Sequence, residues 1–334
     1  MNELNQSNNQ SISGKELYQL THPQKRIWYI EKLYPNTSLY NIGGVSIVSG
    51  KVNFKLLEDA LNLFIKRNDG IRLHFTERNG EVKQYFSDFI KVKIDFFDFS
   101  AGEDPEGEFS AWTMSVMEKP FILLNSNLFY FAIYKVSDGK TGFLGKFHHI
   151  IADGWSINIL TDQVYQIYQQ LSNGEEVGDS LHYSYAEFVN HEQTYLNSER
   201  FTKNLTFWKE KFADIPEPLF NTNSESINGA RVSFPIENSI SDKIQQFCAN
   251  NKFSLNTFFT GLFLIYLSKI SQHQDLVIGL PVLNRSGEKE KSIFGMFTST
   301  MPFRFVLDGN SDALQIMKQI NEHLRKFYIH QKNP

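Results

Sequence analysis

Hydrophobic positions recur at helical spacing in several stretches of the chain, most clearly over residues 53–67. The apolar side chains of this stretch share one helical face: Phe54, Leu57, Leu61, Phe64 and Ile65. Asn53 is a suitable N-cap for it, as Asp153 is for a helix running to about Leu171. The same spacing predicts further helices at 24–33, 108–120, 184–197, 201–213, 240–250, 255–271 and 311–329.

Shorter apolar runs, several of them alternating, predict strands between these helices. They cover 43–50, 71–75, 82–86, 91–99, 128–136, 141–147, 230–236, 275–282 and 300–307. Ser137–Lys140 separates two of them and is typical of a hairpin turn. Helices and strands mix without strict alternation, which indicates an α+β fold.

The chain of 334 residues is too long for one ordinary hydrophobic core, so we expect two lobes. The polar N-terminal residues 1–16 are expected to form a disordered leader. The pattern of helices begins again after a polar stretch at 173–180. This places an N-terminal lobe at 17–176 and a C-terminal lobe at 177–334.

Composition excludes several classes of protein. The chain is 41% hydrophobic and 21% charged, with a net charge of −4 and no basic stripe, which makes a nucleic-acid partner improbable. No apolar run of about eighteen residues exists to span a membrane, and the N-terminus lacks the apolar core of a signal peptide. With Cys248 as the one cysteine no internal disulfide can form, which fits a cytoplasmic location.

The stretch FHHIIADGWSINIL at 147–160 carries the candidate chemistry. A histidine just past a strand end can be held rigidly, and histidine is suited to move one proton near neutral pH. Asp153 at the helix start can cap free N–H groups or pair with an arginine. Gly154 leaves room for a backbone or a substrate to approach.

A purely structural explanation is that Asp153 is an N-cap and the histidines merely end a strand. The paired histidines weigh against it, because the combined pattern arises by chance in about one chain of this length in a thousand. A metal site is disfavoured, since adjacent strand residues point to opposite faces and no third ligand stands at metal-motif spacing. Serine-hydrolase, dinucleotide and P-loop motifs are absent.

His148–Gly154 matches the HHxxxDG signature of the chloramphenicol acetyltransferase-like acyltransferases. Trp155 and Ser156 resemble the condensation domains of nonribosomal peptide synthetases in particular. Four further motifs of that family, and the opening of a sixth, follow the family's order. They lie at 20–28 (LTHPQKRIW), 67–75 (RNDGIRLHF), 185–188 (YAEF), 294–304 (FGMFTSTMPFR) and 330–334 (HQKNP).

Departures from the common motifs resemble the starter subclass, which attaches a fatty acyl group at the head of a lipopeptide. These are the forms RNDxxR and F-x-S-T. The first motif begins about twenty residues from Met1, so we expect no upstream carrier domain and a soluble donor such as acyl-CoA. The chain stops inside the sixth motif, so we expect a fragment that lacks the end of the second lobe.

The resemblance implies two chloramphenicol acetyltransferase-like lobes in a V, with His149 at the floor of a tunnel between them. A donor thioester enters from one side. An aminoacyl group on a carrier's phosphopantetheine arm enters from the other, and its amine attacks the thioester. His149 is expected to position the amine or take its proton, and both roles stay open. His148 completes the signature and is expected to be structural.

The resemblance also assigns supporting roles. Asp153 is expected to pair with Arg67. Other motif positions are expected to hold the lobes or pack the core: Arg72, Gln24, Arg26, Trp28, Trp155 and Trp208. Ser299 and Thr300 are candidates for the channel wall. The resemblance implies no metal and no intrinsic cofactor.

Its expected partners are carrier and adenylation domains of one synthetase, and fatty acyl-CoA or an acyl carrier protein, with the chain acting as a monomer. Three alternatives stay open: an elongation condensation domain with a peptidyl donor, a free-standing acyltransferase, and a non-catalytic platform that recruits partners. An epimerisation domain is less favoured, because Ile157 follows Trp155-Ser156 where that subclass has a different motif.

Overall fold

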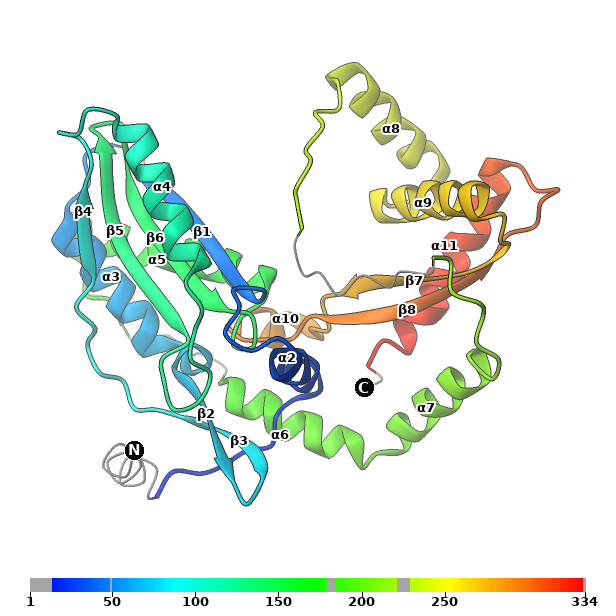
Figure 1. Cartoon of the computed structure of the whole chain (residues 1–334), viewed down its shortest axis with the longest axis horizontal. Helices are drawn as coiled ribbons and strands as arrows, with labels where there is room; N and C mark the ends of the chain where they lie inside the picture. The colour runs from blue at the N-terminus through cyan, green and yellow to red at the C-terminus, as the bar shows by residue number, and fades with distance from the viewer. Residues whose placement is uncertain (1–13, 49, 179–183, 221–228, 333–334) are drawn as a thin grey trace. The chain divides into compact units, whose positions relative to one another are not determined.

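The computed structural model describes residues 14–48, 50–178, 184–220 and 229–332 (Figure 1). The chain forms two compact units. Among the described residues, the first comprises those up to Leu196 together with Leu283–Thr298, and the second comprises those from Asn197 to Val282 together with 299–332. This division differs from the expected boundary at 176/177, because α6 (Tyr185–Leu196) and the segment Leu283–Thr298 both belong to the first unit.

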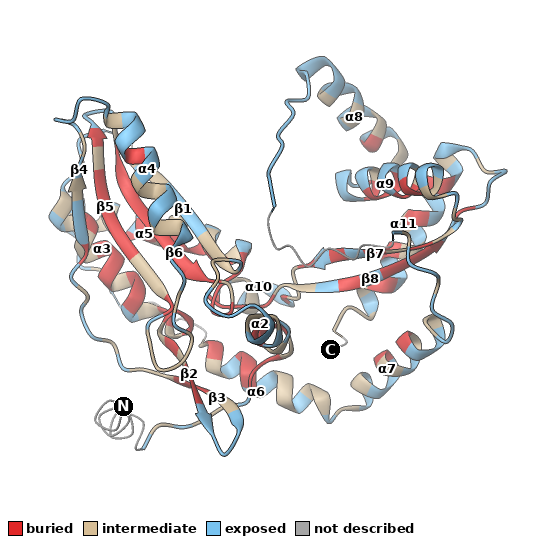
Figure 2. Ribbon diagram, in the orientation of Figure 1, coloured by how far each residue is buried: buried red, intermediate tan, exposed pale blue. Residues whose placement is uncertain are grey.

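A four-stranded sheet in the order β1-β6-β5-β4 is the centre of the first unit. Its strands are β1 (Asn41–Val48), β6 (Lys140–His148), β5 (Phe129–Ser137) and β4 (Asp95–Asp98). β6 pairs antiparallel with both β1 and β5, and β4 pairs parallel with β5. β5 and β6 are buried along most of their length (Figure 2).

Side chains alternate across this sheet and pack against helices on both faces. Phe131 and Phe143 point to the face covered by α3 (Phe54–Arg67) and α5 (Gly154–Ser172). Tyr134 and Val136 point to the other face, where Phe109 of α4 (Pro105–Glu118) packs on them. The sheet therefore holds the end of β6 in a rigid layer.

Several shorter elements complete the first unit. They are α2 (His22–Leu33), η1 (Asp69–Arg72), α10 (Gly287–Lys291), and a hairpin of β2 (Leu73–Arg78) with β3 (Glu81–Phe86).

The second unit contains one antiparallel pair and four helices among its described residues. They are β7 (Asp275–Val282) and β8 (Ser299–Val306), with α7 (Glu199–Lys211), α8 (Asn238–Asn251), α9 (Leu255–Ser271) and α11 (Ala313–Ile329). Its core forms where Trp208, Phe303 and Phe327 meet. None of the described helices is by itself long and apolar enough to span a membrane. α8 and α9, bent by 104°, meet that criterion only as a pair.

The α+β expectation is confirmed, and so are the N-caps. Asn53 accepts hydrogen bonds from the N–H groups of Lys55 and Leu56, and Asp153 accepts one from Ser156. The strand predicted at 230–236 is wrong, because that segment is exposed and pairs with no other strand among the described residues. The strand predicted at 91–99 is confined to Asp95–Asp98.

Candidate active site

The paired histidines lie where β6 ends and a tight turn leads to α5. His148 is the last residue of β6, and the N–H of Ile151 donates to its carbonyl oxygen at 3.1 Å. The N–H of His149 donates to the carbonyl oxygen of Tyr40 at 2.8 Å. The backbone of this turn is thus fixed on both sides of the His149 side chain.

His149 keeps one ring nitrogen without a hydrogen bond. Its Nδ1 is shielded from solvent and has no partner among the described residues. The ring of Tyr40 lies edge-on to the imidazole, with centroids 6.2 Å apart. A ring nitrogen that no described residue engages is left for a hydrogen bond to a bound molecule. An imidazole held in this way can accept or deliver one proton.

His148 differs from His149 because both of its ring nitrogens have partners. Nδ1 accepts from the N–H of Ile150 at 3.2 Å, and Nε2 lies 3.2 Å from Oε1 of Glu31. Burial lowers the pKa of His148, although the Glu31 carboxylate opposes the shift. This arrangement supports the predicted structural role for His148, which stays a prediction.

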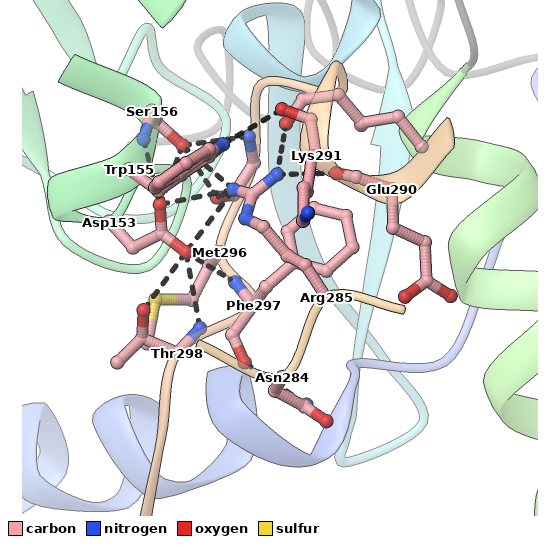
Figure 3. Close-up of polar contacts among 12 residues, drawn as sticks. Asp153, Trp155, Ser156, Asn284, Arg285, Glu290, Lys291, Met296, Phe297 and Thr298 are labelled. Carbon is pink, nitrogen blue, oxygen red and sulfur yellow. Dashed lines mark hydrogen bonds and ion pairs between the residues drawn. The ribbon is translucent and has the colours of Figure 1, made fainter. Parts of the chain in front are cut away.

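Asp153 is completely buried at the start of α5 and connects that helix to a distant segment. Its Oδ1 accepts from both the N–H and the hydroxyl of Ser156, each at 2.9 Å. Its Oδ2 accepts from the N–H groups of Phe297 and Thr298 and from the Thr298 hydroxyl, each at 3.1 Å (Figure 3). Every lone pair of this carboxylate is therefore engaged.

The cation that pairs with Asp153 is Arg285. Its Nη2 lies 3.1 Å from Oδ1 and 3.2 Å from Oδ2, and both side chains are fully buried. Nη1 donates to the carbonyl oxygen of Glu290 at 2.7 Å, and the guanidinium carbon lies 3.8 Å from the centre of the Phe297 ring (Figure 3). Burial lowers the pKa of Arg285, and the charge of Asp153 counteracts this shift.

The predicted pairing of Asp153 with Arg67 is therefore wrong. Arg67 is the last residue of α3 and donates from Nη2 to the carbonyl oxygen of Gly178. Sequence reasoning missed Arg285 because it lies outside every recognised motif, and a pair so distant along the chain leaves no local pattern.

The residues that follow Asp153 fix the first turn of α5. Ser156 is buried, and its Oγ lies 2.8 Å from the carbonyl oxygen of Gly295. Trp155 donates from Nε1 to the carbonyl oxygen of Lys291 at 2.8 Å (Figure 3). Apart from its chain neighbours and the backbone of its own helical turn, a methyl group added at Gly154 would meet no atom within 4 Å. The space beside the exposed Gly154 is thus open, and the approach of a substrate to it stays a prediction.

Two predicted supporting residues, Gln24 and Arg72, form hydrogen bonds to backbone carbonyl groups of the first unit. Gln24 is buried in α2 and donates from Nε2 to the carbonyl oxygen of Ile150 at 3.2 Å, so it holds the histidine turn directly. Arg72 donates from Nη1 to the carbonyl oxygens of Ile65 and Lys66 at 2.6 and 2.8 Å and closes the end of α3. Both act within the first unit, and a role in holding two lobes together stays a prediction.

The remaining predicted site residues belong to α2 and to the second unit. Trp28 is buried in α2 and stacks on Phe75, whereas Arg26 is on the exposed side of that helix. In the second unit Trp208 packs in the core and donates from Nε1 to the carbonyl oxygen of His330 at 2.9 Å. Ser299 and Thr300 begin β8, and their channel role stays a prediction.

Three of the sequence motifs meet around Tyr185. Its hydroxyl donates to the carbonyl oxygen of Met296 at 2.7 Å, and its N–H donates to Oδ1 of Asp69 at 2.8 Å. Burial raises the pKa of Tyr185. A Cβ at Gly70 would lie 2.1 Å from the carbonyl oxygen of Phe294. Glycine is required there because the two backbones approach so closely.

No cluster of three or more histidine, cysteine, aspartate or glutamate side chains suited to a metal ion occurs in the described part of the chain. Among the described residues, the turn offers one oriented imidazole, that of His149. The turn is held by Gln24 and by the backbone of Tyr40. The Asp153–Arg285 pair fixes the start of the helix that follows it.

A family model described as "Condensation domain" matches residues 15–334. Similar curated proteins include surfactin synthase subunit 1 of Bacillus subtilis (strain 168), which is 36% identical over 326 residues. One of the plipastatin synthase subunits of the same strain is 31% identical over 327 residues. The matches cover 95% and 96% of this chain but only 9% and 13% of those proteins, so the chain spans about a tenth of their length.

Solved structures with the same fold include a mutant starter condensation domain of rhizomide synthetase in complex with C8-CoA and Leu-SNAC. It has a TM-score of 0.82 and 23% identity, and the match covers 95% of this chain and 72% of that one. The first condensation domain of the calcium-dependent antibiotic synthetase has a TM-score of 0.85 and 20% identity over 95% and 76%. At these identities the likeness establishes the fold.

Proposed function

The chain belongs to the condensation domain family of nonribosomal peptide synthetases, and from that premise we propose that it is a starter domain. Condensation domains are acyltransferases that form amide bonds. The proposed reaction joins a fatty acyl group from acyl-CoA to an aminoacyl group on a carrier protein. The observation that carries the catalytic part is the oriented His149, whose Nδ1 has no partner among the described residues.

The proposed step forms a carbon–nitrogen bond and breaks a carbon–sulfur bond. The amine of the aminoacyl group attacks the thioester carbonyl, and the thiol of the donor leaves. His149 orients the amine, takes its proton as the tetrahedral species forms, and returns a proton to the departing sulfur. Close positioning of amine and carbonyl supplies much of the rate, because it makes the reaction effectively intramolecular.

Two observations favour the starter assignment. The chain has the motif forms Arg67-Asn68-Asp69 and Phe297-x-Ser299-Thr300 that resemble the starter subclass. A solved starter condensation domain of the same fold binds C8-CoA. The proposed partners are carrier and adenylation domains of one synthetase, with acyl-CoA or an acyl carrier protein as donor. A monomeric, cytoplasmic domain is part of the same proposal.

A carrier-bound peptidyl donor is the second candidate. The curated relatives are parts of large synthetases, including three components of linear gramicidin synthase from Brevibacillus parabrevis. A domain inside such a chain can draw its donor from another carrier. The reaction at His149 is the same in both cases.

Donor competition tests the starter assignment. The enzyme is the longest natural polypeptide that contains this chain. It is incubated with an aminoacyl-loaded carrier and with one of two donors, fatty acyl-CoA or a carrier-bound peptidyl thioester. Intact-mass analysis is expected to show one fatty acyl group added from acyl-CoA. Transfer from the carrier-bound donor alone would remove the starter assignment and keep the condensation chemistry.

Gly154→Ala tests whether a substrate approaches Gly154, because the substitution is expected to change the reaction rate but not the stability of the fold. We expect the melting temperature to stay the same or to rise slightly, because the added methyl meets open space and alanine favours the helix. The rate of amide formation is expected to fall about tenfold or more, because a substrate displaced by the methyl group reacts poorly.

Gly139→Ala is the matched control for this substitution. Gly139 lies in the turn between β5 and β6, and a methyl group there also meets nothing within 4 Å. Its rate is expected to stay unchanged. Equal rates for both variants would show that no substrate approaches Gly154.

A further inference from the structure

A largely buried carboxylate outside the recognised motifs contacts the first histidine of the turn. Glu31 is near the end of α2, and its side chain is 9% exposed. Its Oε1 lies 3.2 Å from Nε2 of His148, whose side chain is 3% exposed. A carboxylate is seldom buried without a purpose that repays its desolvation. Glu31 has no part in the proposed chemistry, because it touches His148 rather than His149.

The hydrogen bonds of His148 determine which nitrogen carries the proton. Nδ1 accepts from the N–H of Ile150 and cannot itself be protonated while doing so. The proton of the neutral ring is therefore on Nε2, which donates to Glu31. A carboxylate on the second nitrogen fixes both the tautomer and the ring orientation of a histidine.

The groups around His148 favour its neutral form. Burial is the largest cause that lowers the pKa of His148, and its neighbours His149 and Lys146 shift it in the same direction. Glu31 is the opposing charge. The rings of Tyr40 and Phe121 lie 6.1 and 6.2 Å from the imidazole. The neutral ring is the form that can accept from Ile150 and donate to Glu31 at once.

Helix α2 therefore holds the histidine turn at two places. Gln24 donates to the carbonyl oxygen of Ile150, and Glu31, two helical turns later, accepts from His148. Ile150 in turn donates its N–H to His148. His149 lies between His148, which contacts Glu31, and Ile150, which accepts from Gln24. A rotation of His148 would therefore shift the peptide units on both sides of His149.

We propose that Glu31 is a positioning residue for the condensation reaction, and that it acts through the tautomer and orientation of His148 to place His149. This inference rests on the proposed function for the role of His149. Its structural half, the fixed tautomer of His148, is independent of which donor the domain uses.

Three substitutions separate the acceptor, the charge and the length of the Glu31 side chain. Glu31→Gln keeps an oxygen acceptor for His148 and is expected to retain the catalytic rate within a few-fold. Glu31→Leu removes the acceptor, and kcat is expected to fall by about 10–100-fold with an unchanged KM for the donor, because misplacement of a catalytic group by about 1 Å costs that much. Glu31→Asp, which keeps the charge but shortens the side chain, is expected to give an intermediate kcat.

Nitrogen-15 NMR of the 334-residue chain labelled at histidine measures the tautomer without any substrate. The resonances of His148 are assigned by their loss in His148→Asn. Wild type and Glu31→Gln are expected to show a proton on Nε2 alone, and Glu31→Leu a mixture of tautomers. Ile27→Val, which alters a buried residue of the same helix, is the control for a general loss of stability and is expected to change neither tautomer nor kcat.

Failure of the proposed role of Glu31 and failure of the proposed starter function give different results. A single Nε2 tautomer together with a wild-type kcat in Glu31→Leu would overturn the proposal. A kcat loss in Glu31→Leu no larger than that in Ile27→Val at the same melting temperature would also overturn it. If Glu31→Leu does not fold, an unchanged kcat in Glu31→Asp would overturn it instead. Absence of transfer from acyl-CoA in the wild type would refute the starter assignment and leave the tautomer result standing. In that case the kcat values of wild type and the Glu31 variants are compared with a carrier-bound donor as the substrate.

Discussion

Asp153→Asn is expected to lower the free energy of unfolding by about 3–5 kcal/mol, because it leaves the buried charge of Arg285 without its partner. The carboxylate accepts from six groups, and an amide replaces one of its oxygens with a donor. That NH₂ would face N–H groups of Arg285, Ser156 or Phe297. Urea denaturation of wild type and variant measures the loss.

Two comparison variants make this result specific. Asp162→Asn changes an exposed carboxylate on the same helix and is expected to stay within about 0.5 kcal/mol of wild type. Arg285→Gln is expected to destabilise to a similar extent as Asp153→Asn, and the double variant by less than the sum, because the two residues interact directly. Additive effects, or a loss in Asp153→Asn no larger than that in Asp162→Asn, would contradict the pairing.

His149→Ala is expected to slow amide formation by about 10²–10⁴-fold, the usual contribution of a positioned acid–base group. Folding is expected to be little affected, because Nδ1 of His149 makes no hydrogen bond among the described residues and the backbone bond to Tyr40 survives the substitution. Single-turnover rates with saturating donor and a loaded carrier measure the loss, and circular dichroism confirms the fold.

The matched control is His191→Ala, which removes an exposed histidine from α6. Its rate is expected to equal that of wild type. A His149→Ala rate within a few-fold of the control would show that the imidazole neither moves a proton nor positions the amine. Unfolding of His149→Ala would instead assign the residue a structural role.

Local patterns were sufficient for much of the fold. Asn53 and Asp153 are N-caps as predicted, because capping depends on a side chain and the N–H groups two or three residues later. The Ser137–Lys140 turn also follows from local residues and joins β5 to β6. The exception is 230–236, whose apolar alternation predicted a strand. A strand needs a partner as well as a pattern, and none pairs with this segment among the described residues.

The histidine turn could be located from the sequence, but its supports could not. Gln24 was recognised through its motif, and the structure shows that it holds Ile150. Arg285 and Glu31 lie outside the recognised motifs and act over long separations along the chain. Their partners are decided by how β6, α2 and the segment Leu283–Thr298 pack. That information is absent from any window of neighbouring residues.

Intact mass of an aminoacyl-loaded carrier is the most direct test of the claim that this chain forms an amide at His149. Wild type and His149→Ala are each incubated with the carrier and with both donors, acyl-CoA and a carrier-bound peptidyl thioester. We predict that wild type adds one donor group to the carrier and that His149→Ala adds none in the same time. Equal addition by both proteins, or none by wild type with either donor, would contradict the account.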